Sequence, residues 1–282
     1  MIYGDGEHGA RLSTGAENIK AVYRQGLGKG GNVKAEQIKL PLTKPLGVKS
    51  VINPMPASGG VDKETRDQAR LNAPIAVLAL DRLVSVQDYA DFARTFAGIA
   101  KASALRLSDG VREVVHLTIA GAGNISIDPT SDLYRNLVAA LERFGDPLQP
   151  LEVESFERVL LVVNAKVSLL PDYLWEVVKE KLRLTLWDKL GFENRQLGQD
   201  VTLSEVVSLM QSIPGVDYVD FELLDSVSED TLKDPDFGAK LTLKSRVNAN
   251  LARMVKNDIV PAQLVFLSQE ASDTLILEEV AE

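Results

Sequence analysis

Cysteine is absent from the 282 residues, and histidine occurs only twice. The absence of thiols excludes disulfide bonds, cysteine nucleophiles and thiolate zinc sites. The two histidines, His8 and His116, lie far apart in the sequence, so a metal site would need both to converge with added carboxylates. No apolar run approaches the roughly 18 residues of a membrane-spanning helix. The stretch after Met1 has no basic segment leading into an apolar one, so no signal peptide is predicted.

The composition is otherwise that of an ordinary globular protein, with 45% hydrophobic and 25% charged residues. The length predicts about two domains and a sizeable buried core. We expect an α+β, multidomain chain. Its four predicted parts are a Gly-rich, basic strand and loop segment at 1–60, a first α+β unit at 61–155, a second α+β unit at 156–225, and a polar linker with C-terminal strands at 226–282.

The net charge of -9 is unevenly distributed. Residues 1–60 contain eight Lys/Arg and four Asp/Glu, whereas the remainder contains 23 and 36. A basic segment can bind phosphate or nucleic acid, but it can equally dock on an acidic neighbour. The acidic remainder, and the lack of aromatic residues near the basic segment beyond Tyr3 and Tyr23, favour docking. No nucleic acid partner is therefore expected.

The first 60 residues combine turns with short apolar stretches. Asp5-Gly6 predicts a hairpin turn, and alternation at 19–24 predicts a strand. A glycine-rich loop at 26–31 lacks the flanking strand, helix and spacing of a dinucleotide site, and Lys29 is not followed by Ser or Thr as in a phosphate-binding loop. A short helix at 35–40 and a strand at 48–51 are also expected.

Residues 53–62 predict a hinge. Pro54 and Pro56 remove backbone donors and fix φ, whereas Gly59-Gly60 permits backbone angles that other residues avoid. Asp62 stands where a helix N-cap belongs. The helix that it begins must end before Pro74, because the residue before a proline disfavours the α region.

The pattern from 75 to 155 predicts a β-α-β-β-α-β unit. Ser85 and Asp88 form a capping-box pattern that starts a helix reaching about Phe96. Strands are predicted at 75–80, 99–107, 112–120 and 151–155, and a second helix at 131–144 that ends at Gly145 as a C′ residue. This order permits a ferredoxin-like sandwich with an antiparallel sheet.

The second unit begins with a strand at 159–170 whose odd positions are all apolar, which predicts one buried face. Leucine and valine then recur every four residues from Leu174 to Leu190, the pattern of an amphipathic helix. Thr202 and Glu205 predict a second capping box and a helix to about Ile213. In the strand that follows, Val219, Phe221 and Leu223 are expected to face inward. Final strands are predicted at 264–267 and 274–277.

A search for catalytic patterns assigns no residue to catalysis, to a cofactor or to a metal. No Gly-x-Ser-x-Gly elbow occurs. His116 alternates with apolar neighbours and is expected on the polar face of its strand. Asp5 and Glu7 lack the spacing of an EF-hand calcium loop.

Three carboxylates and two tryptophans leave other function classes open. Asp217, Asp220 and Glu222 could serve a cell-wall hydrolase if buried in a cleft, but a solvated strand face explains them without catalysis. Trp175 and Trp187 lie on the long predicted helix, where core packing is the default. Either one exposed beside a pocket would indicate a carbohydrate-binding module.

Several motifs resemble the baseplate J-like proteins, wedge components of contractile phage tails and injection systems. They are Tyr3-Gly-Asp-Gly-x-x-Gly9, Gly26-x-Gly28-x-x-Gly31-Asn-Val, Asn53-Pro-x-Pro-Ala-x-Gly-Gly-x-Asp62, Arg70-x-Asn-Ala-Pro74, Ser85-Val-Gln-Asp88-Tyr-Ala-Asp-Phe92, Pro171-Asp-Tyr, Gly198-Gln, Ser204-Glu-Val and Pro214-Gly-Val216. Their order over about residues 1–225 carries the resemblance. Family members usually have more chain before the first motif, so an upstream region is expected to be missing or encoded separately.

The resemblance implies a structural, non-enzymatic wedge subunit without a cofactor. It implies as partners other wedge subunits and a second copy of the chain, with hub and sheath-initiating proteins as further candidates. It also implies assembly in the bacterial cytoplasm and a final place in a phage tail or injection particle. No catalytic residue comes with it.

Overall fold

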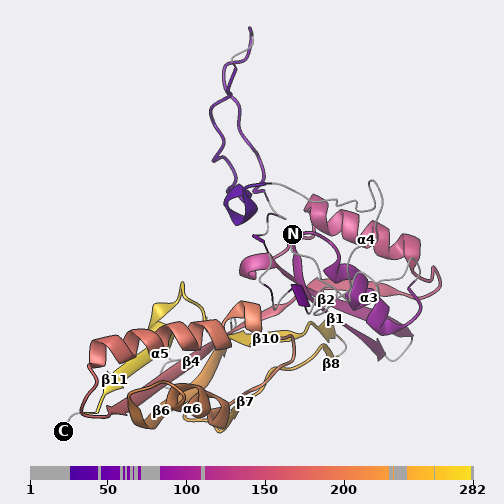
Figure 1. The fold of residues 1–282 in the computed structure, drawn as a ribbon. Helices are drawn as coiled ribbons and strands as arrows, with labels where there is room; N and C mark the ends of the chain where they lie inside the picture. The colour runs from indigo at the N-terminus through magenta and orange to yellow at the C-terminus, as the bar shows by residue number, and fades with distance from the viewer. Residues whose placement is uncertain are drawn as a thin grey trace, which may run out of the picture.

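The computed structural model describes residues 26–43, 46–57, 60, 62–63, 66, 69–70, 83–108, 112–228, 231, 240–256 and 258–280. These residues form a mixed α+β structure, as predicted, with helices packed on small sheets. An arm, residues 37–43 and 46–53, projects from the body (Figure 1). The predicted hairpin turn at Asp5-Gly6 and the predicted strands at 19–24 and 75–80 lie outside the described residues. None of the described helices is long and apolar enough to cross a membrane.

Three strands form the first sheet, in the order β1 (Ile99–Ser108), β2 (Glu113–Gly121), β3 (Leu151–Ser155). Helices α3 (Val86–Arg94) and α4 (Asp132–Phe144) pack against one face through a cluster that includes Leu137 and Leu141. The capping box that begins α3 is confirmed, because the Asp88 N–H donates to Ser85 Oγ at 3.2 Å and the Ser85 N–H donates to Asp88 at 2.7 Å. The Ser85 hydroxyl, which donates to Asp88 Oδ1 at 2.7 Å, and then the Ser85 N–H lower the pKa of Asp88.

The sheet differs in pairing from the expected antiparallel sandwich. β1 and β2 are antiparallel, but β2 and β3 are parallel and hydrogen-bond directly. A ferredoxin-like unit is a split βαβ motif, in which another strand separates the two strands joined by the helix. Here α4 joins adjacent strands. The order of elements from α3 to β3 is as predicted, whereas the ferredoxin-like sheet order is not confirmed.

The second sheet is built around β4 (Glu157–Leu169). β6 (Val216–Ser228) pairs with it antiparallel along nearly its whole length, so β10 (Gln263–Phe266) and β11 (Leu275–Glu279), both parallel to β4, share its other edge. Helices α5 (Trp175–Leu190) and α6 (Leu203–Gln211) bury their apolar stripes on this sheet. In α5 the four-residue repeat from Val178 to Leu190 is buried as predicted, but Leu174 is the N-cap and is exposed.

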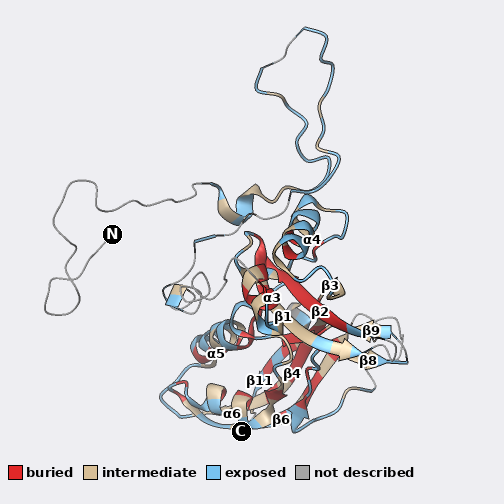
Figure 2. Cartoon of the chain, turned by 90° about the vertical axis from the view of Figure 1, so that its right-hand side faces the viewer, coloured by how far each residue is buried: buried red, intermediate tan, exposed pale blue. Residues whose placement is uncertain are grey.

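Short two-stranded ladders complete the described part: β5 (Val201–Thr202) with β7 (Arg246–Val247), and β8 (Arg253–Val255) with β9 (Asp258–Val260). The two larger sheets meet at Phe156, the single residue between β3 and β4. Its N–H donates to the Ile119 carbonyl at 3.0 Å. An apolar cluster of Ala120, Phe156, Phe192, Leu264 and Phe266 fills the junction. This cluster covers the second face of β2 at Ala120, and Ala262 covers the same face at Thr118, so that strand is buried on both faces (Figure 2).

Four local predictions are wrong. Residues 35–40 form no helix and residues 48–51 form no strand. Gly145 ends α4 but has φ -83, so it is not a left-handed C′ glycine; a Cβ there would meet the Leu141 carbonyl oxygen at 2.6 Å. In β6, a bulge at Glu222 shifts the alternation, so Leu224 rather than Leu223 enters the core.

Candidate assembly interface

The base of the arm is fastened by side chains rather than by a sheet. The amide of Asn32 binds the backbone of Gly60 twice, with Nδ2 donating to the carbonyl and Oδ1 accepting from the N–H, each at 2.8 Å. A Cβ on Gly60 would meet the Gly28 carbonyl oxygen at 2.5 Å, so glycine is required by close packing. Asp62, predicted as an N-cap, accepts the Lys29 N–H at 2.9 Å. The hinge stretch is thereby tied to residues 28–32.

A second asparagine joins the two sides of the arm. Asn53 Oδ1 accepts the Ile38 N–H at 2.8 Å, and its Nδ2 donates to the carbonyls of Lys34 and Met55, each at 2.9 Å. The Asn53 carbonyl accepts the Glu36 N–H at 2.8 Å. Both asparagines belong to the motifs noted in the sequence, but periodicity gave no sign of these contacts. Where a side-chain amide, and not a neighbouring strand, bonds the backbone, the sequence carries no periodic apolar pattern that would predict the contact.

Between Ile38 and Ile52 the arm carries exposed apolar side chains. Even-numbered apolar side chains recur along both of its sides, and they are between 37% and 106% exposed: Ile38, Leu40, Leu42, Leu46, Val48 and Ile52. Alternation with period two is the pattern of a strand with one buried face. In the described residues 39–43 and 46–52, no strand is formed and nothing buries that face. We call residues 37–43 and 46–53 the arm, and the six exposed side chains of Ile38, Leu40, Leu42, Leu46, Val48 and Ile52 the arm stripe.

The arm base also contacts the body. Lys29 Nζ lies 3.3 Å from Glu193 Oε1, an exposed ion pair. A cavity of about 520 Å³ lies between the arm base and the first sheet, lined on one side by Met55 and Pro56 and on the other by Ile125 and Asp128. The walls are mainly apolar, and no cluster of ionisable groups in the lining suggests catalysis.

A second exposed apolar surface follows the start of α5. Leu174 and Val177 are 70% and 51% exposed, and Leu184 lies two helical turns further along. Trp175 and Trp187 are half-buried and pack on the core of the second sheet, where Lys179 and Arg183 cover their rings at 5.4 and 4.8 Å. Neither tryptophan lines the two described cavities. The condition for a sugar-binding site is therefore not met by these cavities.

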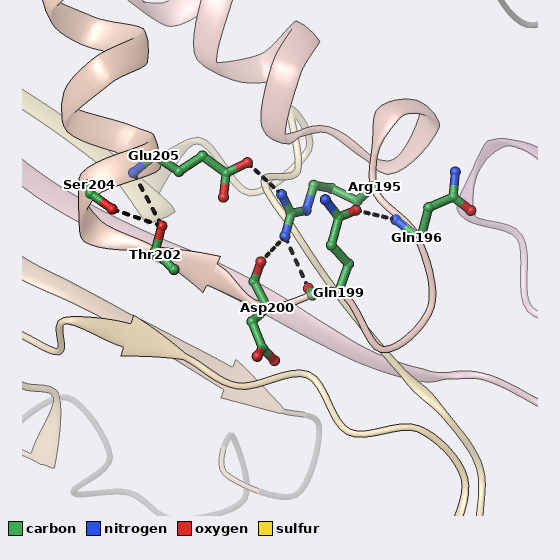
Figure 3. Close-up of polar contacts among 7 residues, drawn as sticks. All are labelled: Arg195, Gln196, Gln199, Asp200, Thr202, Ser204 and Glu205. Atoms are coloured by element: carbon green, nitrogen blue, oxygen red, sulfur yellow. Dashed lines mark hydrogen bonds and ion pairs between the residues drawn. The ribbon is translucent and has the colours of Figure 1, made fainter.

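A buried arginine organises the loop between α5 and α6 (Figure 3). Arg195 is 1% exposed; Nη1 donates to Glu205 Oε1 at 2.9 Å, and Nη2 donates to the carbonyls of Gln199 and Asp200. Desolvation lowers the pKa of Arg195. Thr202 caps α6 as predicted, but Glu205 binds Arg195 instead of completing the capping box. Nothing in the sequence pattern distinguished Arg195 from a surface residue.

The Asp200 carboxylate holds the segment that contains β7 in place. It accepts the Ala249 N–H at 2.6 Å, the main reason that the pKa of Asp200 is lowered, and it pairs with Arg246. Residues 246–250 are thereby held against the second unit. The contacts of Arg195 and Asp200 stabilise the fold and leave no open polar pocket for a substrate.

Two buried basic side chains lie where the sheets meet. Lys101 Nζ donates to the Glu193 carbonyl at 3.0 Å and lies 5.1 Å from the Phe192 ring centroid. Burial lowers the pKa of Lys101 to about 8. His116, expected on a polar strand face, is fully buried, with Nε2 3.2 Å from Glu154. The expectation is wrong because the C-terminal strands cover this face, where the Ala262 N–H donates to Thr118 Oγ1 at 3.0 Å.

The other residues considered for chemistry do not converge. Asp217, Asp220 and Glu222 are exposed on β6, and Glu222 pairs with Lys166. No group of three or more possible metal ligands occurs in the described residues. His8, Asp5, Glu7 and Gly59 lie outside them.

Comparison with known proteins identifies one segment. Residues 81–154 match the family model described as the baseplate J-like central domain. This range runs from shortly before α3 to the end of β3. No curated protein matches the chain.

Among solved structures, the chain is similar to one from a cryo-EM structure of the anti-feeding prophage baseplate, 6-fold symmetrised. The identity is 15% and the TM-score 0.45, with 80% of this chain covered. The chain spans about half, 47%, of the length of that protein. The match confirms the family resemblance noted in the sequence for this segment: residues 81–154 form a baseplate J-like central domain.

Proposed function

We propose that this chain is a structural subunit of the baseplate of a contractile tail or injection system. The observation that carries the proposal is the baseplate J-like central domain at 81–154. The arm supports it, because an exposed apolar stripe on an extended segment fits a protein that is completed by its neighbours. The scattered carboxylates favour no enzymatic alternative.

In finer terms, the role proposed is that of a wedge component that helps to close a ring around the central hub. Its partners would be other wedge subunits and a second copy of the chain, with hub and sheath-initiating proteins as further candidates. The exposed apolar surface on α5 offers one face for such contacts, and the arm offers another. Assembly in the bacterial cytoplasm, followed by incorporation into the particle, belongs to the same proposal.

The domain boundaries near 60, 155 and 225 are part of this proposal, as is movement at residues 53–62 when the baseplate is triggered. Gly60 is held by Asn32, so a hinge movement would have to release two hydrogen bonds or occur beside them. Replacing Gly59 and Gly60 together should impair assembly or firing. Normal firing by such a variant would exclude the hinge.

Deletion of the gene in the source organism tests the function directly. Electron microscopy should then show tails or particles without a completed baseplate, and the intact gene supplied in trans should restore them. Complete, contractile particles in the deletion strain would overturn the proposal. As a matched control, a variant with the exposed Glu142 replaced by Gln should complement fully.

A further inference from the structure

The arm stripe has the pattern of a half-buried strand, but no other part of the chain that the structure describes covers it. Leu40 and Leu42 are 89% and 104% exposed, and Leu46 on the returning side is 106% exposed. Large apolar side chains at every second position are costly to leave in water, and a single exposed strand gains nothing from them. A partner that adds a neighbouring strand would bury the stripe and satisfy the free backbone groups.

The backbone of residues 37–43 is suited to pairing on one side only. Successive residues of a strand direct their backbone groups to opposite edges, so a single neighbour is bonded through alternate residues. The proline in this stretch, Pro41, stands at an odd position and lacks an N–H. Pairing through the even positions Leu40 and Leu42 would therefore lose no donor to the proline, as in strands that carry proline on an outer edge, whereas the Ile38 N–H is already held by Asn53 Oδ1 at 2.8 Å.

The body of the same chain carries an open strand edge of matching length. β6 pairs with β4 on one edge. On its other edge, Leu224 forms an isolated β-bridge with Leu243, whereas residues 216–222 have no strand neighbour among the described residues. Seven extended residues span roughly 23 Å, the length of 37–43 as well as of 216–222. Exposed edges of this length are normally paired, covered or charged.

The charges on the two elements are complementary. Residues 37–43 contain one charged residue, Lys39, and the returning side of the arm, residues 46–53, adds Lys49. Residues 216–222 of β6 contain Asp217, Asp220 and Glu222 and no basic residue. All three carboxylates are exposed. Such an edge repels acidic strands and attracts a basic one.

Within one molecule the two elements cannot meet. Figures 1 and 2 show the arm projecting from one end of the body and β6 at the opposite end. Any pairing of these two elements would therefore have to occur between molecules. We propose that residues 37–43 of one copy add a strand to the outer edge of β6 in a second copy. The inference rests on the proposed function, which it deepens by naming one interface of the subunit.

The absence of cysteine allows a direct test by disulfide trapping. Leu42→Cys and Tyr218→Cys, both at exposed positions, are introduced together into the full chain. Mild oxidation should give a covalent product at twice the mass of one chain as the main species. The matched control combines Leu42→Cys with Ala139→Cys on the exposed face of α4, and it should give only a trace. Circular dichroism should show that both variants are folded.

The experiment is run on the isolated chain and on the chain co-expressed with the products of the flanking genes. A cross-link between positions 42 and 218, but not between positions 42 and 139, in either preparation supports pairing of the arm with β6 of a second copy. Equal yields from both cysteine pairs, or no cross-link in either preparation, overturn it. A cross-link from position 42 to a different protein also overturns it while leaving the baseplate function intact. Failure of the chain to enter any complex would count against the proposed function itself.

Discussion

The side-chain amide of Asn32 forms two hydrogen bonds of 2.8 Å with the backbone of Gly60, one to its carbonyl and one from its N–H, although the two residues lie 28 positions apart. The side-chain amide acts here as a strand neighbour would, offering one donor and one acceptor to a single residue. This contact, with those of Asn53, sets the direction in which the arm leaves the body. The arm is thus oriented by two amide groups and not by a sheet.

Gly60→Ala should release the arm without unfolding the body. Its Cβ would lie 2.5 Å from the Gly28 carbonyl oxygen and 2.6 Å from Asn32 Oδ1, so both hydrogen bonds must break. Two neutral hydrogen bonds are worth about 1–3 kcal/mol together. Trypsin should cut faster after Lys34 and Lys39, while the thermal midpoint stays nearly unchanged. Gly30→Ala, where a Cβ meets nothing within 4 Å, is the matched control and should leave the cutting rate unchanged.

Arg195→Met should destabilise the second unit. The variant leaves Glu205, whose side chain is 37% exposed, and the carbonyls of Gln199 and Asp200 without their buried partner, and the loss of hydrogen bonds to a charged group costs about 1.5–3 kcal/mol. Arg195→Lys should also be destabilising, because an ammonium cannot reproduce the fork of the guanidinium. Urea denaturation measures both. A midpoint equal to that of the original chain would show that the buried network contributes nothing to stability.

Leu182→Ala should lower the free energy of unfolding by about 2–5 kcal/mol, since it removes a fully buried side chain from the core of the second sheet. Val177→Ala on the same helix is the control. Val177 is 51% exposed, so its truncation should change the same free energy by less than about 0.5 kcal/mol. Similar losses for the two variants would contradict the placement of α5.

Stability should rise in alkaline solution because of Lys101. Burial lowers the pKa of Lys101 in the folded state from 10.5 to about 8, so between these values the unfolded chain binds more protons. The free energy of unfolding therefore increases with pH across this window, by up to about 3 kcal/mol. Below pH 8 the cost of burying the charge is fully present. Denaturation at pH 8 and pH 10 measures the change.

Lys101→Met isolates this contribution, because every other titrating group stays in place. The variant should be more stable than the original chain at pH 7, and the difference should shrink towards pH 10. If the difference in free energy of unfolding were the same at all pH values, the Lys101 ammonium group would be solvated and not buried in the junction between the sheets.

The sequence predicted elements well where the signal is local. The Ser85 and Asp88 capping box marked the start of α3, the four-residue repeat marked α5, and β3 was predicted at 151–155 as observed. Long-range pairing was not predicted. The parallel strands β10 and β11 join β4 across a gap of about a hundred residues, and no local pattern encodes that partner.

The same limit applies to the candidate interface. The arm stripe alternates in the sequence, but whether its side chains are covered depends on what the rest of the chain reaches, so only the structure reveals that they are bare. His116 illustrates the converse, since its strand face looked exposed until the C-terminal strands were seen to cover it. Polar anchors such as Asn32 and Arg195 carry no periodic signal at all.

The central claim, that this chain is a baseplate subunit built to join neighbours, is tested most directly by co-expression with the products of the flanking genes. The complex is isolated through an affinity tag on this chain, and its mass is measured under native conditions. The account predicts a stoichiometric complex with other tail proteins that survives purification. A stable monomer without partners, obtained when those proteins are present and folded, would contradict it.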